Sequence, residues 1–469
     1  MSLYEFIQRA SREFEQKMSE LGQNWDTEQL TGDLAQQART ALVESFGHAS
    51  RAAYQAFLES YDRPEPQIEH QGQTLRYKAI SPKTFLTSFG TITLDRRLYQ
   101  ADTGGPSHVP LDQFWDMEGH FAVEEVRQAV CYALAHMTAG EAEQLLRLGA
   151  LFQPSATAIQ HIVDKVSAEI EPQREALDNT IRAGVELPAA TKVLVASLDG
   201  ANVLLREPGP PRGRPQERPR GEPPEPKNAT YKNAMVGSIS FYAAVSEATA
   251  GPERLRSLYT ARMPQEGAVT FKRDFERQLE LIEKQLNPQV RKVLLCDGQR
   301  VLWNYLNHQK RFDAYEKLVD FYHTDEHLSH AAEALFGKKS EQAQRWYAKY
   351  RRVLLEQDDG VRAVRRSLAY YARRRRGSAE RRQALAAERK FFRRNHQRMA
   401  YASFRRRGVP IGSGPVEAAC KSLIRTRLCR SGMRWSRAGG QRILTFRCYA
   451  KSGLWKEFWE TYQQLRRSA

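Results

Sequence analysis

Two short segments that share one design constrain the fold of this chain more than any other feature. Residues 192–200 and 291–298 each consist of an apolar run, an aspartate and a glycine. A continuous apolar run of this length is typical of a strand that is buried on both faces, in a sheet covered by helices. The sequence therefore predicts an α/β domain whose sheet contains both segments.

Further strands are predicted around these two. We interpret Asp199-Gly200 as a tight turn, with residues 201–206 returning as the hairpin partner of the first strand. Residues 236–245 read as a third strand and 317–323 as a short fifth one. The fourth, 291–297, follows an amphipathic helix at 268–286 and should lie parallel to a neighbour. If that neighbour is the first strand, Asp199 and Asp297 end adjacent strands.

The positive charge of the chain is confined to one stretch. The whole sequence has a net charge of +17, and residues 338–407 contain 23 Lys and Arg against 6 Asp and Glu, which is also +17. The rest of the chain has equal numbers of basic and acidic residues. A surplus this concentrated repels itself unless a polyanion neutralises it, and nucleic acid is the first expectation, ahead of a membrane surface.

A third carboxylate stands near the C-terminus. Gly412-Ser413-Gly414 reads as a turn, Pro415 suits a first helical turn, and the predicted helix runs from 416 to about 428. Glu417 then shares one helix face with Cys420, Ile424 and Leu428. By itself it reads as an acid that complements the helix dipole. A carboxylate in line with an apolar stripe is otherwise costly unless a cation meets it.

Asp199, Asp297 and Glu417 together are the ligand set that a two-magnesium site needs. Magnesium prefers oxygen ligands and binds few carboxylates, because phosphate oxygens and water complete its shell. Two such ions activate the attacking oxygen and stabilise the leaving one in a displacement at phosphorus. Without metal, three clustered carboxylates repel one another. We therefore expect two Mg²⁺ ions held by these three residues, with Mn²⁺ able to substitute.

Several segments resemble the DDE transposases of the bacterial ISKra-type insertion sequences. They are SLDG at 197–200, LLCDG at 294–298, DFYHTDEHL at 320–328, GSGPVEAACKSLIRTRL at 412–428, SGMRWS at 431–436, KTFLTSFGTITLDRRLY at 83–99 and LFQPSATAIQHIV at 151–163. The resemblance implies a ribonuclease H-like mixed five-stranded sheet that cuts and joins DNA. It also implies that Asp199, Asp297 and Glu417 are the catalytic, metal-binding triad.

Asp320 and His323 are similar to the Cys/Asp-x-x-His motif of hAT and Mutator-like transposases. The resemblance implies a supporting role for both near the scissile DNA, whereas an ordinary polar residue at a strand end is the alternative for His323. The basic helical block at 325–407 then resembles the insertion that those enzymes carry before the final glutamate. The proline-rich residues 208–226 are expected to form an exposed insertion without a counterpart in that family.

The N-terminal part of the chain is expected to be mainly helical with a β-hairpin. Helices are predicted over 1–62, and strands over 74–80 and 84–98 with a turn at Ser81-Pro82. Helices at 137–146 and from Ser155 onward form either a DNA-reading helix-turn-helix, with Thr157, Gln160, His161 and Lys165 exposed, or a plain helical hairpin. The expected regions are 1–62 helical, 63–118 β-hairpin, 119–188 helical and DNA-binding, 189–324 catalytic, 325–407 basic insertion, and 408–469 the end of the catalytic domain with C-terminal helices.

The composition fits a soluble enzyme of the bacterial cytoplasm. No segment is apolar enough to span a membrane or to act as a signal peptide, and five scattered cysteines without CxxC pairs indicate reduced thiols. We expect a nucleoid-associated protein that binds double-stranded DNA, both transposon ends and target, as a homodimer or larger assembly. The residues expected to contact DNA are Arg373, Arg374, Arg375, Arg376, Lys421, Arg425, Gln160 and Lys165.

The predicted function is therefore a transposase that cuts the ends of an insertion sequence and joins them to target DNA. Two alternatives remain open on the sequence. One is a nuclease on the same fold that hydrolyses DNA without strand transfer. The other is a DNA-binding regulator whose acidic residues are structural.

Overall fold

The computed structural model describes residues 3–22, 32–149, 152–206, 229–245, 251–374 and 378–468. The chain divides into two compact units, Met1–Pro172 and Gln173–Ala469. Helix α6 (Ala156–Ala183) contributes to both units and contains Pro172 at the division. No helix in the described ranges is both long and apolar enough to cross a membrane.

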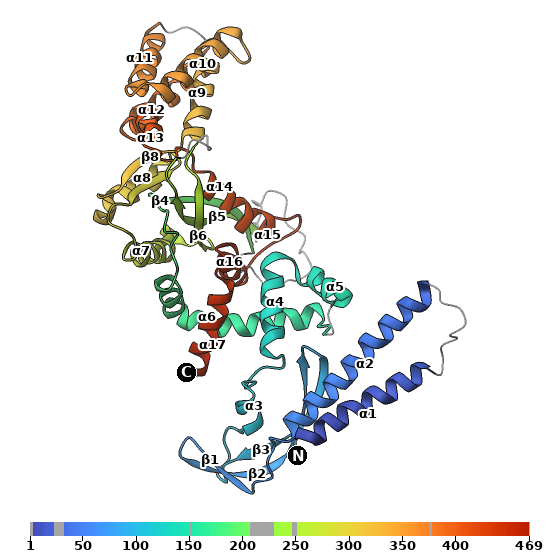
Figure 1. The fold of residues 1–469 in the computed structure, drawn as a ribbon. Coiled ribbons are helices and arrows are strands. Elements are labelled where there is room, and N and C mark those ends of the chain that lie inside the picture. The colour runs from blue at the N-terminus through green and yellow to red at the C-terminus, as the bar shows by residue number, and fades with distance from the viewer. Residues whose placement is uncertain are drawn as a thin grey trace, which may run out of the picture. The chain divides into compact units, whose positions relative to one another are not determined.

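The N-terminal unit combines helices with a small sheet (Figure 1). Helices α1 (Leu3–Gly22) and α2 (Gly32–Glu59) pack side by side, with Phe6 against Phe57 and Phe14 against Phe46. A three-stranded antiparallel sheet follows, and three helices of the described ranges connect it to α6. Their bounds are β1 (Gln67–His70), β2 (Gln73–Thr87), β3 (Gly90–Gln100), α3 (Pro110–Phe114), α4 (Glu124–His136) and α5 (Ala139–Gly149).

The predicted turn at Ser81-Pro82 is wrong. Strand β2 runs through both residues, and Pro82 pairs with Asp95 of β3 while the chain reverses after Thr87. Proline is tolerated in a strand where its missing N–H is not needed by the neighbour. The predicted hairpin is thus part of a three-stranded sheet, with β1 on the outer side of β2.

A five-stranded mixed sheet forms the centre of the C-terminal unit. Its order is β6-β5-β4-β7-β8, in which β4, β5 and β6 are antiparallel neighbours and β4, β7 and β8 are parallel. The bounds are β4 (Val193–Arg206), β5 (Ala229–Tyr242), β6 (Arg254–Arg262), β7 (Arg291–Cys296) and β8 (Glu316–Val319). The unit is therefore α/β with a mixed five-stranded sheet, and the parallel pairing of β4 with β7 is confirmed.

The sheet has the predicted number of strands, but one predicted strand is absent as a separate element and one observed strand was not predicted. Asp199-Gly200 does not turn, because β4 continues to Arg206 and pairs with β5 along its whole length. Conversely, β6 was not predicted from the sequence. This edge strand carries Arg254, Arg256 and Arg262 among its nine residues, so the apolar signal that marked the central strands is weak there. The proline-rich segment 208–226 lies outside the described residues.

Helices cover both faces of this sheet. Helix α7 (Val269–Glu283) packs on the face of Gly237 and Leu198, where Phe275 lies so close that a Cβ on Gly237 would meet its ring at 2.5 Å. Asp199 points to the opposite face because successive strand residues alternate. The remaining helices are α8 (Arg300–His308), α14 (Gly414–Ala419), a π-helical segment (Cys420–Arg425), α15 (Thr426–Leu428), α16 (Arg437–Lys451) and α17 (Trp455–Ser468).

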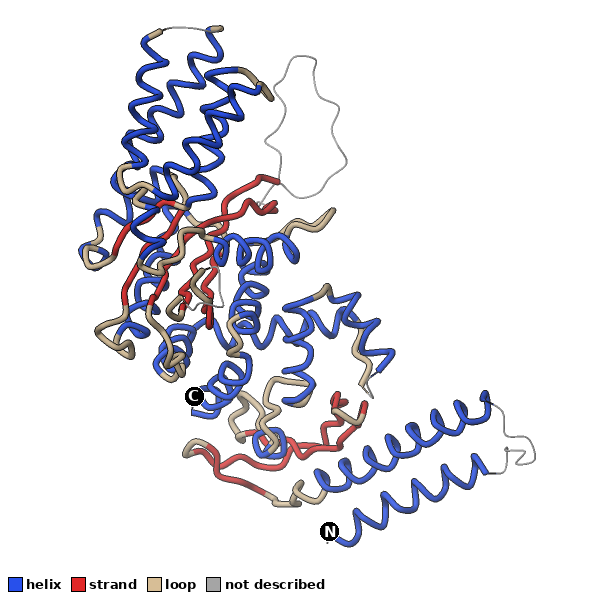
Figure 2. Tube along the Cα trace, turned by 45° about the horizontal axis from the view of Figure 1, so that its top comes forward, coloured by secondary structure: helices blue, strands red, loops and turns tan. Residues whose placement is uncertain are grey.

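A bundle of four helices is inserted between β8 and α14. Figure 2 shows its helices running side by side at one end of the sheet. They pack in a closed cycle, α9 on α10, α10 on α11, α11 on α12 and α12 on α9. The bounds are α9 (Phe321–Phe336), α10 (Glu341–Glu356), α11 (Gly360–Arg373) and α12 (Ala379–Asn395), followed by the short α13 (Tyr401–Arg406).

Candidate active site

Three aspartates lie at the same level on the three parallel strands, Asp199 within β4 and Asp297 and Asp320 directly after β7 and β8. Every pair of β4 with β7 is offset by 98 residues, as in Val193 with Arg291, which places Asp199 level with Asp297. Strands β7 and β8 pair without a register shift from Val293 with Glu316 to Cys296 with Val319. One residue beyond both strands, Asp297 lies level with Asp320. The strand order therefore gathers residues that are far apart in the sequence.

Asp199 and Asp297 open into one pocket together with Glu417. The pocket has a volume of about 600 Å³, and its wall is formed by Leu198 and Asp199 of β4, the end of β7, the first turns of α9, and α14 with the π-helical segment. The lining residues are Leu198, Asp199, Asp297, Tyr322, His323, Glu326, Ser413, Gly414, Val416, Glu417, Ala418, Cys420, Lys421 and Arg425. The structure thus brings together the three carboxylates that the sequence analysis selected.

Burial and mutual repulsion act on the acids of this pocket. Desolvation, followed by the nearby negative charge of Asp199, raises the pKa of Asp297 above its ordinary value, although the backbone N–H of Gln299 donates to its Oδ1 at 3.1 Å. The Cys420 thiol donates to Asp199, and burial together with that carboxylate raises its pKa. Within the described ranges, no lysine or arginine forms an ion pair with Asp199, Asp297 or Glu417. The three carboxylates therefore have no ion-pair partner among the described residues.

A tight approach of the bundle explains Gly298. A Cβ at this position would lie 2.3 Å from the ring of Phe391 on α12, so a larger residue after Asp297 displaces either the bundle or the turn. Arg394 of the same helix donates to the carbonyl of Gly298 at 2.9 Å. The Asp-Gly pair at 297 is therefore a contact point for the inserted helices.

Glu417 lies on α14, directly before a widened turn of helix. The segment Cys420–Arg425 is π-helical, and it separates α14 from α15. Cys420, Ile424 and Leu428 are buried and Glu417 is exposed, while Glu417 and Cys420 both line the pocket. Ser413 donates its hydroxyl to Glu417 Oε1 at 2.9 Å.

Asp320 has a structural position instead of a place in the pocket wall. Strand β8 ends at Val319, so the prediction that the strand extends over residues 320–323 is wrong. Asp320 is the N-cap of α9, and His323 lies in the first turn of that helix, where it lines the pocket. The Asp320 side chain is fully buried and accepts hydrogen bonds from the backbone N–H groups of His323 and Ser413.

The other residues expected to bind DNA fall in several places. Lys421 and Arg425 are exposed and line the pocket. Arg373 and Arg374 are exposed at the end of α11, with Arg374 over the ring of Tyr370 at 4.2 Å, whereas Arg375 and Arg376 lie outside the described residues. In the N-terminal unit, Gln160 donates to Asp164 and Lys165 pairs with Glu169, both along α6. Thr157 and His161 are also exposed.

A second group with metal-ligand chemistry was missed by the sequence analysis. His327, His330 and Glu388 offer ligand atoms within 4.8 Å of one another, on α9 and α12. His327 Nδ1 lies 2.6 Å from Glu388 Oε2, and its ring stacks on Phe391. The His-x-x-His spacing was visible in the sequence, but the third ligand is 61 residues away and only the bundle supplies it.

Comparisons with known proteins leave the family open. No protein-family model and no curated protein matches the chain. Among solved structures, it is similar to the strand transfer complex of the Drosophila P element transposase, at 11% identity over 71% of this chain and 79% of that one, with a TM-score of 0.24. A similarity at this level establishes neither a shared fold nor a shared activity.

Proposed function

We propose that this chain is a DNA transposase with a ribonuclease H-like catalytic domain, as its resemblance to ISKra-type enzymes implies. The observation that carries the proposal is the placement of Asp199, Asp297 and Glu417 around one pocket. Two come from level positions on adjacent parallel strands, and the third comes from a helix that follows the inserted bundle.

The pocket offers three carboxylates from separate elements, which is a ligand set for a pair of divalent cations. In two-metal sites the ions lie about 3.5–4 Å apart and share such ligands. The raised pKa of Asp297 and the lack of an ion-pair partner for the three carboxylates among the described residues support a cation at this place.

Asp199, Asp297 and Glu417 would hold the Mg²⁺ ions. When bound, the metal would activate the attacking oxygen and stabilise the leaving oxygen at phosphorus. Lys421 and Arg425, on the same wall as Glu417, would bind the phosphates on either side of the scissile bond. His323 would contact the DNA from the first turn of α9, and Asp320 would hold that turn in place.

The proposed reaction has two displacements. Water attacks the phosphorus at an element end, a P–O bond forms, and the P–O3′ bond breaks to release a 3′-hydroxyl. That hydroxyl then attacks a phosphodiester of target DNA, so that one P–O bond forms as another breaks and the total number of phosphodiesters is kept. Because two ends must be joined to one target, we propose that the active form is a dimer or a larger assembly.

One assay separates this function from its alternatives. Purified protein is incubated with Mg²⁺, labelled DNA from the ends of the element and a target plasmid. The proposal requires labelled ends joined to the plasmid. Cleavage without joining would indicate a nuclease, and binding without either would indicate a DNA-binding regulator.

A further inference from the structure

The bundle carries a second pocket in which six of the nine lining residues are basic. It has a volume of about 580 Å³ and lies between α11 and α12. Its lining residues are Arg362, Arg365, Arg366, Leu368, Ala369, Ala386, Arg389, Lys390 and Arg393. We call this surface the arginine groove. Its basic residues all lie in the basic stretch at 338–407, and none of them is among the individual residues expected to contact DNA.

The groove is built by the same spacing on both helices. Apart from Leu368, its residues recur at i, i+3, i+4 and i+7, from 362 to 369 on α11 and from 386 to 393 on α12. This spacing puts them on one face of each helix, where a helix pair normally places apolar side chains. The apolar contacts lie deeper instead, through Val364, Leu368 and Leu385. The groove is therefore a basic channel above the bundle core.

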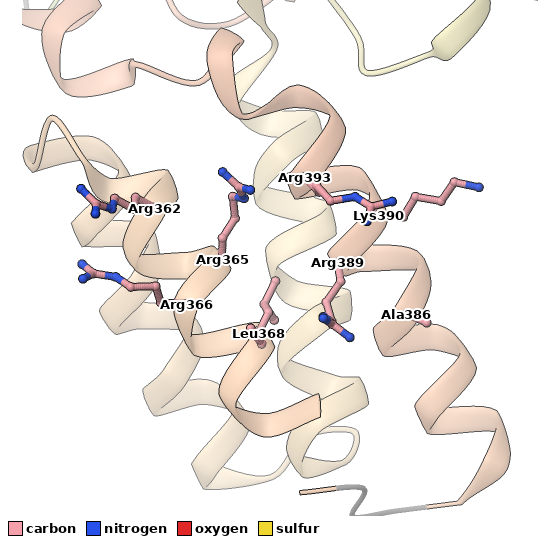
Figure 3. Close-up of a pocket in the computed structure, with 9 residues that line it drawn as sticks. Arg362, Arg365, Arg366, Leu368, Ala386, Arg389, Lys390 and Arg393 are labelled. Atoms are coloured by element: carbon pink, nitrogen blue, oxygen red, sulfur yellow. The ribbon is translucent and has the colours of Figure 1, made fainter. Parts of the chain in front are cut away.

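Figure 3 shows how these side chains lie. Arg365 and Leu368 on α11 and Arg389 on α12 point into the space between the helices, whereas Arg362, Arg366 and Lys390 form its outer rims. The basic side chains are all exposed or half-buried. An open surface of this kind suits an extended anion that passes along it, because a small anion would remain largely hydrated there.

The charge in the groove is not balanced by the protein. Among the described residues, the single ion pair that involves one of its six basic side chains joins Arg366 to Asp359 at 3.9 Å. The neighbouring α10 differs, since its exposed Arg345 and Arg352 each pair with a glutamate four residues away. Six like charges around one groove repel one another unless an external anion neutralises them.

We infer that the arginine groove binds the phosphate backbone of double-stranded DNA. The choice of DNA as the polyanion rests on the proposed function, but the groove itself does not depend on the catalytic residues. At a rise of about 1.5 Å per residue, the basic positions extend over about 6 Å along each helix. Phosphates of one DNA strand are spaced about 3.4 Å apart along the duplex axis, so each helix spans about two of these spacings.

The test is a DNA-binding measurement on the full chain without catalysis. A labelled duplex of mixed sequence is titrated with protein in EDTA at several salt concentrations. In the variant with Arg365→Ala and Arg389→Ala, we expect affinity to fall about tenfold or more. The slope of log K against log salt should decrease by about 2, because each lost phosphate contact removes about 0.9. The variant with Lys at both positions should recover most of the affinity.

The matched control is Arg345→Ala with Arg352→Ala, which also removes two exposed arginines from the bundle. Because glutamates already balance their charge, we expect affinity within about twofold of wild type. The inference is overturned if both alanine pairs weaken binding equally, or if the groove pair binds DNA as the wild type does. It is also overturned if RNA or a single strand of the same length binds the groove in preference to duplex DNA.

This result can be told apart from a failure of the proposed function. If wild-type protein never cuts element-end DNA in Mg²⁺ but loses duplex binding on loss of Arg365 and Arg389, the groove stands and the transposase proposal fails. If the wild type cuts and joins DNA while the groove variant binds duplex normally, the transposase proposal stands and the arginine groove inference fails. Circular dichroism melts identify any variant that has lost its fold.

Discussion

The buried carboxylate of Asp320 accepts a hydrogen bond from the backbone N–H of Ser413, 93 residues further along the chain. Its other oxygen accepts from the N–H of His323 at 2.7 Å. Since the residues between these points form the bundle, one side chain ties together the two ends of the insertion. The same bond holds the turn from which α14 presents Glu417 to the pocket.

Replacing Asp320 with alanine should destabilise the C-terminal unit. The change leaves the buried N–H groups of His323 and Ser413 without acceptors, which costs about 1–3 kcal/mol for each unsatisfied group. We expect the free energy of unfolding in urea to fall by about 2–4 kcal/mol. Asp313→Ala removes an exposed aspartate nearby and should change it by less than about 0.5 kcal/mol. Equal unfolding midpoints for wild type and Asp320→Ala would refute the structural role.

Replacing Glu417 with glutamine should strongly reduce cleavage and leave DNA binding intact. The amide keeps the shape of the side chain but removes the charge that would hold the metal, so we expect cleavage to fall by about 10²–10³-fold. Affinity for duplex DNA in EDTA should stay within about twofold. Glu326→Gln is the control, since this carboxylate lines the same pocket and is not in the proposed triad. If Glu326→Gln is the inactive variant instead, the third acid has been misassigned.

Magnesium should stabilise the folded protein. A ligand that binds only the native state adds about 2.7 kcal/mol at a free concentration of about 100 times its Kd. We therefore expect millimolar Mg²⁺ to raise the melting temperature of the wild type, and Asp199→Asn to abolish most of that rise. The His327, His330 and Glu388 group provides a check, because His330→Ala should keep the full Mg²⁺ response. An unchanged response in Asp199→Asn would place the magnesium elsewhere.

Replacing Asp297 with asparagine should stabilise the metal-free protein at neutral pH. Burial and the charge of Asp199 raise the pKa of Asp297 above its ordinary value of 3.8, so the folded state holds this proton more tightly than the unfolded state. The free energy of unfolding therefore falls as pH rises from the ordinary to the raised pKa, and the penalty persists above it. Asparagine removes that penalty and still accepts from Gln299.

Thermal melts in EDTA across a pH series would measure this effect. We expect Asp297→Asn to melt above the wild type near pH 7, and the difference to narrow toward pH 4 as the wild-type carboxyl becomes protonated. Asp313→Asn, at an exposed position, should melt as the wild type does throughout. A variant that is less stable than wild type at neutral pH would show that the Asp297 charge is already compensated in the folded protein.

The sequence by itself predicted the central part of the fold. The apolar runs at 192–198 and 291–296 identified two buried neighbouring strands because apolar continuity is a local property. The helix between them forced a parallel crossover, which set Asp199 level with Asp297. The third carboxylate came from a local helix signal and from the resemblance of residues 412–428, and the structure places it at the same pocket.

Only the tertiary structure decided what depends on distant partners. Asp199-Gly200 has the composition of a turn, but pairing with β5 on one side keeps β4 extended through both residues. Asp320 is level with two acids of the pocket, yet its side chain is committed to the N–H of Ser413. The arginine groove likewise exists because α11 and α12 lie side by side. Local sequence fixes what each segment prefers, whereas these outcomes depend on which segment packs against it.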